Sequence, residues 1–221
     1  RNDDPPALLI DDVTVDESAG VAYVTVTLDH PLEQAVTVDY QTADQTAADA
    51  ADYQTTSGSL TFNSYEQTKT ITIPIVNSDT VELAETFLVN LSNVQTTGFA
   101  VSIADSQAVV TITDDDRAGF SVADVSVNEE SGTAVVTVSL DQPVDGPVSV
   151  NYTTADGSAV EGTDYLGASG TLTFDAGQQT GEIIIDLIDT ALIELDEIFL
   201  VNLTLLQDNG RDIILVDNQA E

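Results

Sequence analysis

Short runs of alternating apolar and polar residues recur along the whole chain. The run VAYVTVTL at residues 21–28 alternates branched apolar side chains with small polar ones, and TAVVTVSL at 133–140 repeats the pattern. A period of two is typical of a β-strand with one buried face. Gly, Asp, Asn and Pro separate such runs at the spacing of about 8–12 residues found in sandwiches and barrels. The pattern therefore predicts an all-β protein, with further strands near residues 35–43, 58–62, 69–76, 85–91 and 108–113.

The chain repeats itself with an offset of 112 residues. VTVDESAGVAYVTVTLDHP, from Val13, aligns with VSVNEESGTAVVTVSLDQP, from Val125, and VELAETFLVNL, from Val81, aligns with IELDEIFLVNL, from Ile193. The alignment needs no insertion or deletion. A period this long indicates a duplicated domain rather than a solenoid repeat of about 20–50 residues. We predict two antiparallel β-sandwiches in tandem, at residues 8–116 and 117–221.

The same offset describes the two ends of the chain. It places NDD, at residues 2–4, on DDD at 114–116, so residues 1–7 are interpreted as the tail of a preceding repeat and a linker. It places Glu221 on Val109, so the second copy is expected to lack its last strand. Both observations suggest a segment of a longer array of repeats.

The strongly acidic composition of the chain argues against some classes of function. The 221 residues include 39 Asp and Glu but only 4 Lys and Arg, for a formal net charge of -35. This balance argues against binding to nucleic acid or to an anionic membrane surface, which require a basic face. Disorder is the alternative that strong net charge suggests, but 42% of the residues are hydrophobic and fall in regular β-branched runs. There is no Cys, and no apolar stretch approaches the roughly 18 residues of a membrane span.

Three consecutive aspartates, Asp114, Asp115 and Asp116, end the last strand of the first copy. Adjacent like charges cost free energy unless something compensates them. One interpretation is a solvated acidic linker. The other is a cation site, for which the hard, oxygen-preferring Ca²⁺ suits carboxylates. Zn²⁺ fits poorly because it prefers Cys and His, and His30 is the single histidine.

These motifs together resemble the Calx-beta domain. VDESAG, VDYQTAD, ADY, SGSLTF, VELAETFLVNL and a closing VVTITDDD occur in the family's order, and all but the last recur in the second copy in closely similar form. The domain is found in sodium/calcium exchangers, in the cytoplasmic tail of an integrin β subunit and in very long bacterial surface proteins. The resemblance implies a seven-stranded, immunoglobulin-like sandwich in each copy. It also implies that acidic residues from distant segments bind calcium at one end of the sandwich.

Carried over position by position, the resemblance implies two sets of metal ligands. In the first copy the set is Glu17, Asp52, Glu82, Glu85, Asp114, Asp115 and Asp116, and in the second it is Glu129, Asp164, Asp189, Glu194 and Glu197. The family's central loop usually starts with adjacent aspartates, but here Asn77 and Ser78 precede Asp79. One calcium position is therefore expected to be weakened. The second copy has Thr190 in this loop and lacks the terminal triad.

The leading functional hypothesis is a calcium-binding spacer or adhesion stalk of a large extracellular or cell-surface protein, not an enzyme. Calcium would stiffen the joint between neighbouring repeats. One alternative is a module that recognises an extracellular protein or a glycan and holds calcium only structurally. Another is a calcium-sensing regulatory domain of a membrane transporter. A glycosidase with paired carboxylates is disfavoured because aromatic sugar platforms are nearly absent, with no Trp and 5% aromatic residues.

Overall fold

The computed structural model describes residues 5–190 and 193–221 and divides the chain into two compact units. The first unit extends to Ser78 and continues with Ala84–Asp115, whereas the second contains Asp79–Leu83 and Asp116–Glu221. The expected tail of a preceding repeat falls mostly on residues 1–4, outside the described residues. Within the described ranges, no helix is long and apolar enough to cross a lipid bilayer.

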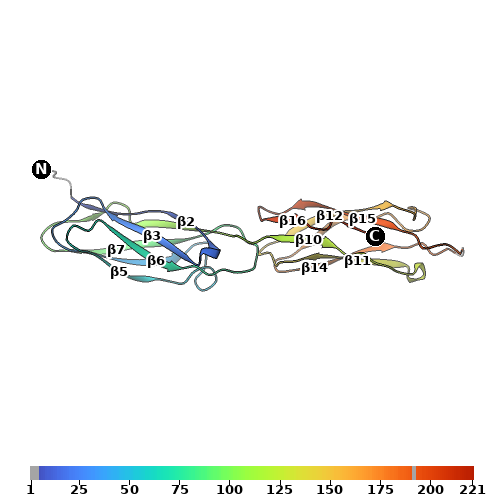
Figure 1. Cartoon of the computed structure of the whole chain (residues 1–221), viewed down its shortest axis with the longest axis horizontal. Helices are drawn as coiled ribbons and strands as arrows, with labels where there is room; N and C mark the ends of the chain where they lie inside the picture. Colours follow the sequence, from blue (N-terminus) through green and yellow to red (C-terminus); the bar gives the residue numbers. More distant parts are fainter. Residues whose placement is uncertain (1–4, 191–192) are drawn as a thin grey trace. The chain divides into compact units, whose positions relative to one another are not determined.

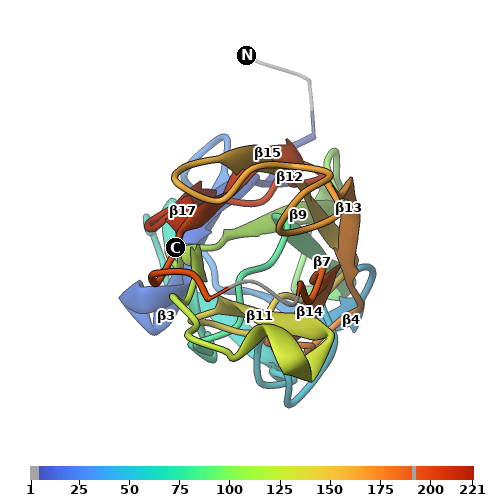
Figure 2. The same ribbon diagram turned by 90° about the vertical axis from the view of Figure 1, so that its right-hand side faces the viewer.

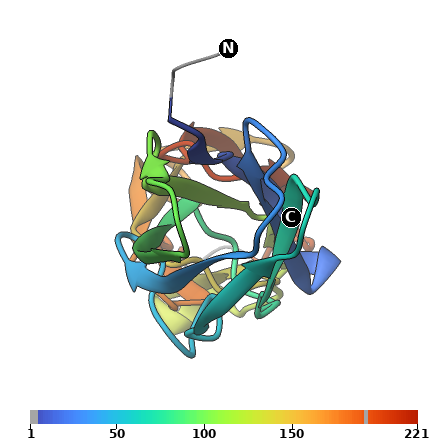
Figure 3. The ribbon, with the colours of Figure 1, turned by 90° about the vertical axis from the view of Figure 1, so that its left-hand side faces the viewer.

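The first unit is a β-sandwich of two facing sheets (Figures 1 and 3). Its elements are β1 (Ala7–Ile10), β2 (Val13–Asp16), the 3₁₀ turn η1 (Glu17–Ala19), β3 (Val21–Leu28), β4 (Val36–Asp44), β5 (Ser57–Phe62), β6 (Thr68–Pro74), β7 (Glu85–Thr96), β8 (Ser102–Ile103) and β9 (Gln107–Thr113). One sheet has the order β6-β3-β1-β8 and the other β2-β9-β7-β4-β5. This is the expected immunoglobulin-like architecture.

The first stretch of strand serves both sheets, because β1 pairs with β3 in one and β2 pairs with β9 in the other. The chain changes sheet at Asp11 and Asp12, where Asp12 Oδ1 accepts a hydrogen bond of 2.7 Å from the Val109 backbone N–H. The β2–β9 and β1–β8 pairings are parallel, in sheets whose other pairings are antiparallel. The alternating pattern predicts strands but does not specify their direction, so these parallel pairs were not predicted.

The second unit repeats the first (Figure 2). Its elements are β10 (Ala118–Val122), η2 (Glu129–Ser131), β11 (Thr133–Leu140), β12 (Val148–Asp156), β13 (Ser169–Phe174), β14 (Thr180–Asp186), β15 (Phe199–Gln207), β16 (Ile213–Leu215) and β17 (Gln219–Ala220). The sheets are β14-β11-β10-β16 and β13-β12-β15-β17. β17 corresponds to the start of β9, because the pair Val201↔Ala220 repeats Val89↔Ala108 at the offset of 112.

The alternating residues form the cores. In β3, Ala22, Val24, Val26 and Leu28 are at most 1% exposed, and they face the buried side chains of the opposite sheet. Tyr53 is fully buried and stacks on Phe87 with ring centroids 4.0 Å apart. In the second unit Tyr165 stacks on Phe199 in the same way. The paired tyrosines therefore hold the corner between the strands, which agrees with their recurrence in both copies.

The segment Asp79–Leu83 belongs to the second unit although it lies in the first sequence repeat. Val81 is fully buried in the core of that unit and forms an isolated parallel bridge with Val144. Its N–H donates to Pro143 O (2.9 Å), and its carbonyl accepts from the Asp145 N–H (3.1 Å). The chain therefore passes between the units at three points: before Asp79, after Leu83 and before Asp116.

Candidate metal centre

The register of three strands directs acidic side chains to one end of the first sandwich. In β9, Ile112 is opposite Glu85 of β7 and Val15 of β2. Side chains two residues apart on a strand share a face. Glu17 lies two residues beyond Val15 and Asp114 two beyond Ile112, so the sheet directs both toward the end of the core that Glu85 also borders.

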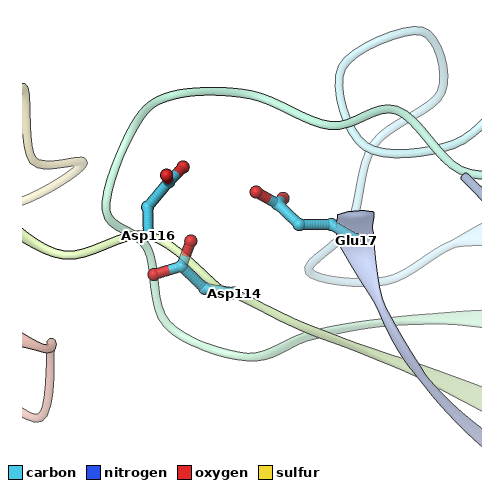
Figure 4. Close-up of side chains that lie close together, drawn as sticks. All are labelled: Glu17, Asp114 and Asp116. Atoms are coloured by element: carbon cyan, nitrogen blue, oxygen red, sulfur yellow. The ribbon is translucent and has the colours of Figure 1, made fainter. Parts of the chain in front are cut away.

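Glu17, Asp114 and Asp116 form a compact carboxylate cluster (Figure 4). Each offers one carboxylate oxygen, and these three oxygens lie within 4.8 Å of one another. Glu17 is only 4% exposed, while the two aspartates are half-buried. Three carboxylates this close repel one another, and burial adds the cost of removing a charge from water.

The 3₁₀ turn η1 holds Glu17 in position. Asp16 caps the turn, its Oδ1 accepting a hydrogen bond of 3.0 Å from the Ser18 N–H. Gly20 ends the turn at φ 69°, a left-handed conformation that suits glycine. In the second unit Asn128 and Gly132 cap η2 in the same way. The cap residues were not among the predicted site residues, although an Asp or Asn two residues before Ser or Glu is a recognisable capping signal.

Asp115 lies outside the cluster. It is exposed, whereas its neighbours Asp114 and Asp116 are half-buried. In an extended chain consecutive side chains point in opposite directions, so the three aspartates divide into two that face the cluster and one that faces water. The sequence alone gave all three the same role.

The other predicted ligands of the first copy are also outside this cluster of three. Asp52 stabilises its own turn, because its Oδ2 accepts from the Ala48 N–H (2.6 Å). Its carbonyl accepts from the Val76 N–H at 2.9 Å, and the adjacent Ile75 N–H donates to the carbonyl of Gly20 beside η1. Asp52 is thereby connected, through Val76 and Ile75, to Gly20 at the end of the turn that carries Glu17. Glu82 lies in the segment Asp79–Leu83, and Glu85 begins β7.

Four predicted ligands of the second copy also lie together. The pKa of Glu197 is raised, first by loss of hydration and then by the negative charges of Asp164 and Glu194, with a smaller contribution from Glu129. Asp164 repeats the role of Asp52, its Oδ2 accepting from the Val160 N–H at 2.7 Å. Thr190 donates through Oγ1 to Glu194 Oε2 at 3.2 Å. Asp189 is exposed.

The donor chemistry of both groups fits a hard divalent cation. All the charged ligands are carboxylates, and Glu17 Oε1 and Asp116 Oδ2 are shielded from solvent. Ca²⁺ accepts six to eight oxygen ligands at about 2.3–2.6 Å, with carboxylates, backbone carbonyls and water all suitable. A cation would neutralise the repulsion among Glu17, Asp114 and Asp116, so the residues present fit calcium.

The fold and these carboxylate groups define a class. The Calx-beta domain family matches residues 2–116 and again residues 115–221, and the chain belongs to this family as two tandem domains.

Among the chain's relatives are sodium/calcium exchangers. An alignment that runs over 191 residues and covers 78% of the chain gives 33% identity to sodium/calcium exchanger 1 of Canis lupus familiaris. An alignment that runs over 210 residues and covers 85% of the chain gives 30% identity to sodium/calcium exchanger 3 of Mus musculus. The matches span only 20% and 23% of these relatives. A similar solved structure is the crystal structure of CBD12 from CALX1.2, with a TM-score of 0.46 and 26% sequence identity. The match covers 91% of this chain and 82% of the chain in that structure.

Proposed function

We propose that this chain is a non-enzymatic calcium-responsive module, and that it acts as a regulatory part of a larger protein. The observation that carries the proposal is the convergence of Glu17, Asp114 and Asp116 from separated segments onto one point. The exchangers named above are calcium-transporting relatives, which favours the regulatory interpretation over the adhesion stalk. These relatives give no support to an extracellular location or to a protein or glycan ligand, and those hypotheses are not carried forward.

The chain's own residues supply the mechanism. Without a cation, mutual repulsion favours separation of the end of β9 from η1. Calcium supplies positive charge to the carboxylate group when it is bound. Glu17, Asp114 and Asp116 would then hold β2 and β9 together at the end of their parallel pairing. A ligand that binds only the ordered state stabilises it by RT ln(1 + [L]/Kd), or about 2.7 kcal/mol at one hundred times Kd.

The position of the cluster in the sequence connects it with the second unit. β9 ends at Thr113 and β10 begins at Ala118, so the connecting segment 114–117 includes both aspartates of the cluster. Fixing Asp114 and Asp116 on a cation would restrict the backbone dihedrals of this segment. We therefore propose that calcium limits the freedom of the connection and so passes a signal along the chain.

Calcium titration tests the proposal. We expect isothermal calorimetry to detect saturable binding, and thermal unfolding to shift to higher temperature in calcium than in chelator. The double variant Asp114→Asn with Asp116→Asn should lower affinity by at least about tenfold, or about 1.4 kcal/mol.

Asp115→Asn is the control, because it removes one negative charge from the exposed position between the two substituted aspartates. It should retain affinity within about twofold, or about 0.4 kcal/mol. If the control loses half as much binding free energy as the double variant, the affinity follows overall charge and not the position of the carboxylates. A chelator without effect on unfolding would refute the function.

A further inference from the structure

The first and last strands of the first unit run side by side in the same direction. The first strands are β1 and β2, and the last are β8 and β9. β2 pairs in parallel with β9 over four positions, from Val13↔Val110 to Asp16↔Thr113. β1 pairs in parallel with β8 over two positions. We call these two parallel pairings together the terminal seam.

Tension applied along the chain loads the terminal seam lengthwise. A force on the residues before β1 pulls the first strands backwards, and a force on the residues after β9 pulls the last strands forwards. The hydrogen bonds of a ladder lie across the strands, so lengthwise sliding strains all of them at once. Strands that are pulled apart sideways instead lose these bonds one at a time. The same bonds therefore withstand more force when the strands are sheared than when they are unzipped.

Two side chains add hydrogen bonds across the terminal seam. Asp12 Oδ1, between β1 and β2, accepts a hydrogen bond of 2.7 Å from the Val109 N–H in β9. Thr113 Oγ1, in the last residue of β9, donates to the Val15 carbonyl in β2 at 3.3 Å. Both bonds join a first strand to a last strand, so both resist the sliding that tension produces.

The first strands are also anchored in both sheets of the sandwich. β1 pairs with β3 over three positions in one sheet, whereas β2 lies at the edge of the other. Leu8 and Ile10 of β1 are buried in the core, as are Val110 and Ile112 of β9. A force on the first strands is therefore shared between the sheets, and sliding would also disturb the packing of core side chains.

The second unit repeats part of this arrangement. Its strand β10 pairs in parallel with β16 over three positions. Arg117, immediately before β10, donates through Nε and Nη2 to Asp212 Oδ2 at 2.9 and 2.7 Å, immediately before β16. The corresponding positions of the first unit are Pro5 and Ala100, which cannot form an ion pair. The parallel pairing of an early with a late strand thus occurs in both units.

We propose that the first unit is a force-bearing module, in which the terminal seam resists tension applied along the chain. Forced unfolding is governed by the rate of unfolding, so this resistance is distinct from stability at equilibrium. A unit that keeps its fold under tension passes the tension on to the rest of its protein, whereas a unit that yields absorbs it by extending.

Calcium binding would strengthen the terminal seam, and this part rests on the proposed function. Glu17 follows β2 and Asp114 follows β9, so the carboxylate cluster lies at the end of the seam where β9 ends (Figure 4). When Glu17, Asp114 and Asp116 share a cation, β2 and β9 cannot slide past each other without separating the ligands. The resistance to tension should therefore be greater in calcium.

The direction of pulling tests the terminal seam in chelator, without calcium. The chain contains no Cys, so engineered cysteines fix the points of attachment. Pro5→Cys with Asp115→Cys applies the force along the seam, and Ser18→Cys with Asp115→Cys pulls apart the adjacent ends of β2 and β9. All three positions are exposed.

Single-molecule force spectroscopy of the whole chain compares these two geometries at one loading rate. We expect the first unit to unfold at a higher force when it is pulled along the seam, because the seam bonds must then break together. Equal unfolding forces in the two geometries would overturn the proposal.

Two Thr→Val variants separate resistance to force from equilibrium stability. Thr113→Val removes a hydroxyl bond across the seam, and Thr42→Val removes one of the same 3.3 Å length to the Thr56 carbonyl, away from the seam. At constant force along the seam, Thr113→Val should shorten the lifetime about fivefold, which corresponds to about 1 kcal/mol. Thr42→Val should shorten it less, because its surroundings are still intact when the seam breaks. If urea unfolding shows that Thr42→Val is not folded, Ser64→Ala replaces it, removing the 2.6 Å bond to the Glu33 carbonyl.

An equal or larger effect of the variant away from the seam would contradict the role of the seam. It would show that the lifetime under force follows the overall stability of the unit.

Calcium is tested separately, with the force applied along the seam. We expect calcium to raise the unfolding force, and Asp114→Asn with Asp116→Asn to remove this increase while the dependence on pulling direction in chelator remains. If calorimetry shows that calcium binds but the unfolding force does not change, the reinforcement is overturned and the proposed function stands. If calcium does not bind, the proposed function fails, while a dependence on pulling direction in chelator still supports the force-bearing seam.

Discussion

Glu17 is a carboxylate in a position with almost no access to water. At 4% exposure and close to Asp114 and Asp116, its charge is unfavourable without a cation. Glu17→Gln keeps the shape of the side chain and removes the charge, so we expect opposite effects in the two conditions. In chelator the melting temperature should rise by a few °C, since about 1 kcal/mol shifts a domain of this size by about 4–8 °C.

Added calcium should raise the melting temperature of Glu17→Gln by less than that of the wild type, because one ligand has lost its charge. Differential scanning calorimetry in chelator and in calcium measures both effects. A variant that is less stable in both conditions would mean that Glu17 is structural and carries no electrostatic cost.

Tyr165 and Asp156 give the second unit a pH-dependent contribution to stability. Tyr165 donates to Asp156 Oδ1 at 2.8 Å, which lowers the pKa of Asp156. Burial and this hydrogen bond raise the pKa of Tyr165 to about 12. Because the pKa of Asp156 is lowered in the folded state, the ionised carboxylate stabilises the fold at pH values above the pKa of an unfolded Asp, about 3.9. This stabilisation is lost as the pH falls through the lower pKa of the folded state. Because the pKa of Tyr165 is raised in the folded state, the neutral phenol stabilises the fold below about pH 10, the pKa of an unfolded Tyr. This stabilisation is lost as the pH rises toward about 12.

Tyr165→Phe should therefore destabilise the second unit most at neutral pH. The difference from wild type should shrink on both the acid and the alkaline side, as measured by urea unfolding across the pH range. Tyr53→Phe, at the equivalent corner of the first unit, is the parallel case, because Tyr53 donates to Asp44 Oδ1 at 2.6 Å. A difference that is constant with pH would contradict the role of the hydrogen bond.

At the scale of elements, the segment Asp79–Leu83 shows that the same repeated motif is buried in one copy and exposed in the other. Val81 is fully buried in the second unit, whereas its repeat counterpart Ile193 is fully exposed, at 103%. Val81→Ala removes two buried methyl groups and should destabilise the second unit by about 1–3 kcal/mol. Ile193→Ala should change stability by no more than about 0.5 kcal/mol.

Thermal unfolding followed by hydrogen exchange distinguishes the units. In Val81→Ala the loss of protection should be greatest near Pro143–Asp145, whose backbone bonds to Val81. Equal effects of the two substitutions would show that the segment is not held in that core. Val81 and Ile193 both begin the same repeated motif, so a difference between the two variants reports the burial of the side chain and not its local sequence.

Over the whole molecule, negative charge far exceeds the available positive charge. The described cations are Lys69, Arg117 and Arg211, and each pairs with a carboxylate, as in the 2.7 Å contact of Arg117 with Asp212. The net charge of -35 is what remains after the 4 Lys and Arg are counted against the 39 Asp and Glu. Self-repulsion of this kind destabilises a compact state, and salt screens it, with a Debye length of about 10 Å at 0.1 M.

We therefore expect two separable effects of added ions. NaCl in the presence of chelator should raise the melting temperature gradually with ionic strength. Calcium at matched ionic strength should add a saturable increase, and Mg²⁺ a smaller one, since it requires a tighter octahedral geometry and retains its water. Equal increases in melting temperature from Mg²⁺ and Ca²⁺ at matched ionic strength would mean that calcium acts only by screening charge.

The sequence by itself determined the strands, the duplication and the class of fold. The alternation in VAYVTVTL is a local property, because side chains on a strand alternate between faces whatever the strand pairs with. The offset of 112 residues likewise needed no structure. The resemblance of the acidic motifs to those of the Calx-beta domain indicated the kind of chemistry, since carboxylates are ligands that suit Ca²⁺.

Only the tertiary structure decided which acidic residues meet. Asp114 and Asp116 join Glu17 while Asp115 faces water, a difference that depends on the direction in which the chain leaves β9. The parallel pairing of β2 with β9 and the burial of Val81 in the second unit are contacts between residues far apart in the chain. Local patterns cannot specify such contacts, because they depend on how whole elements pair and pack.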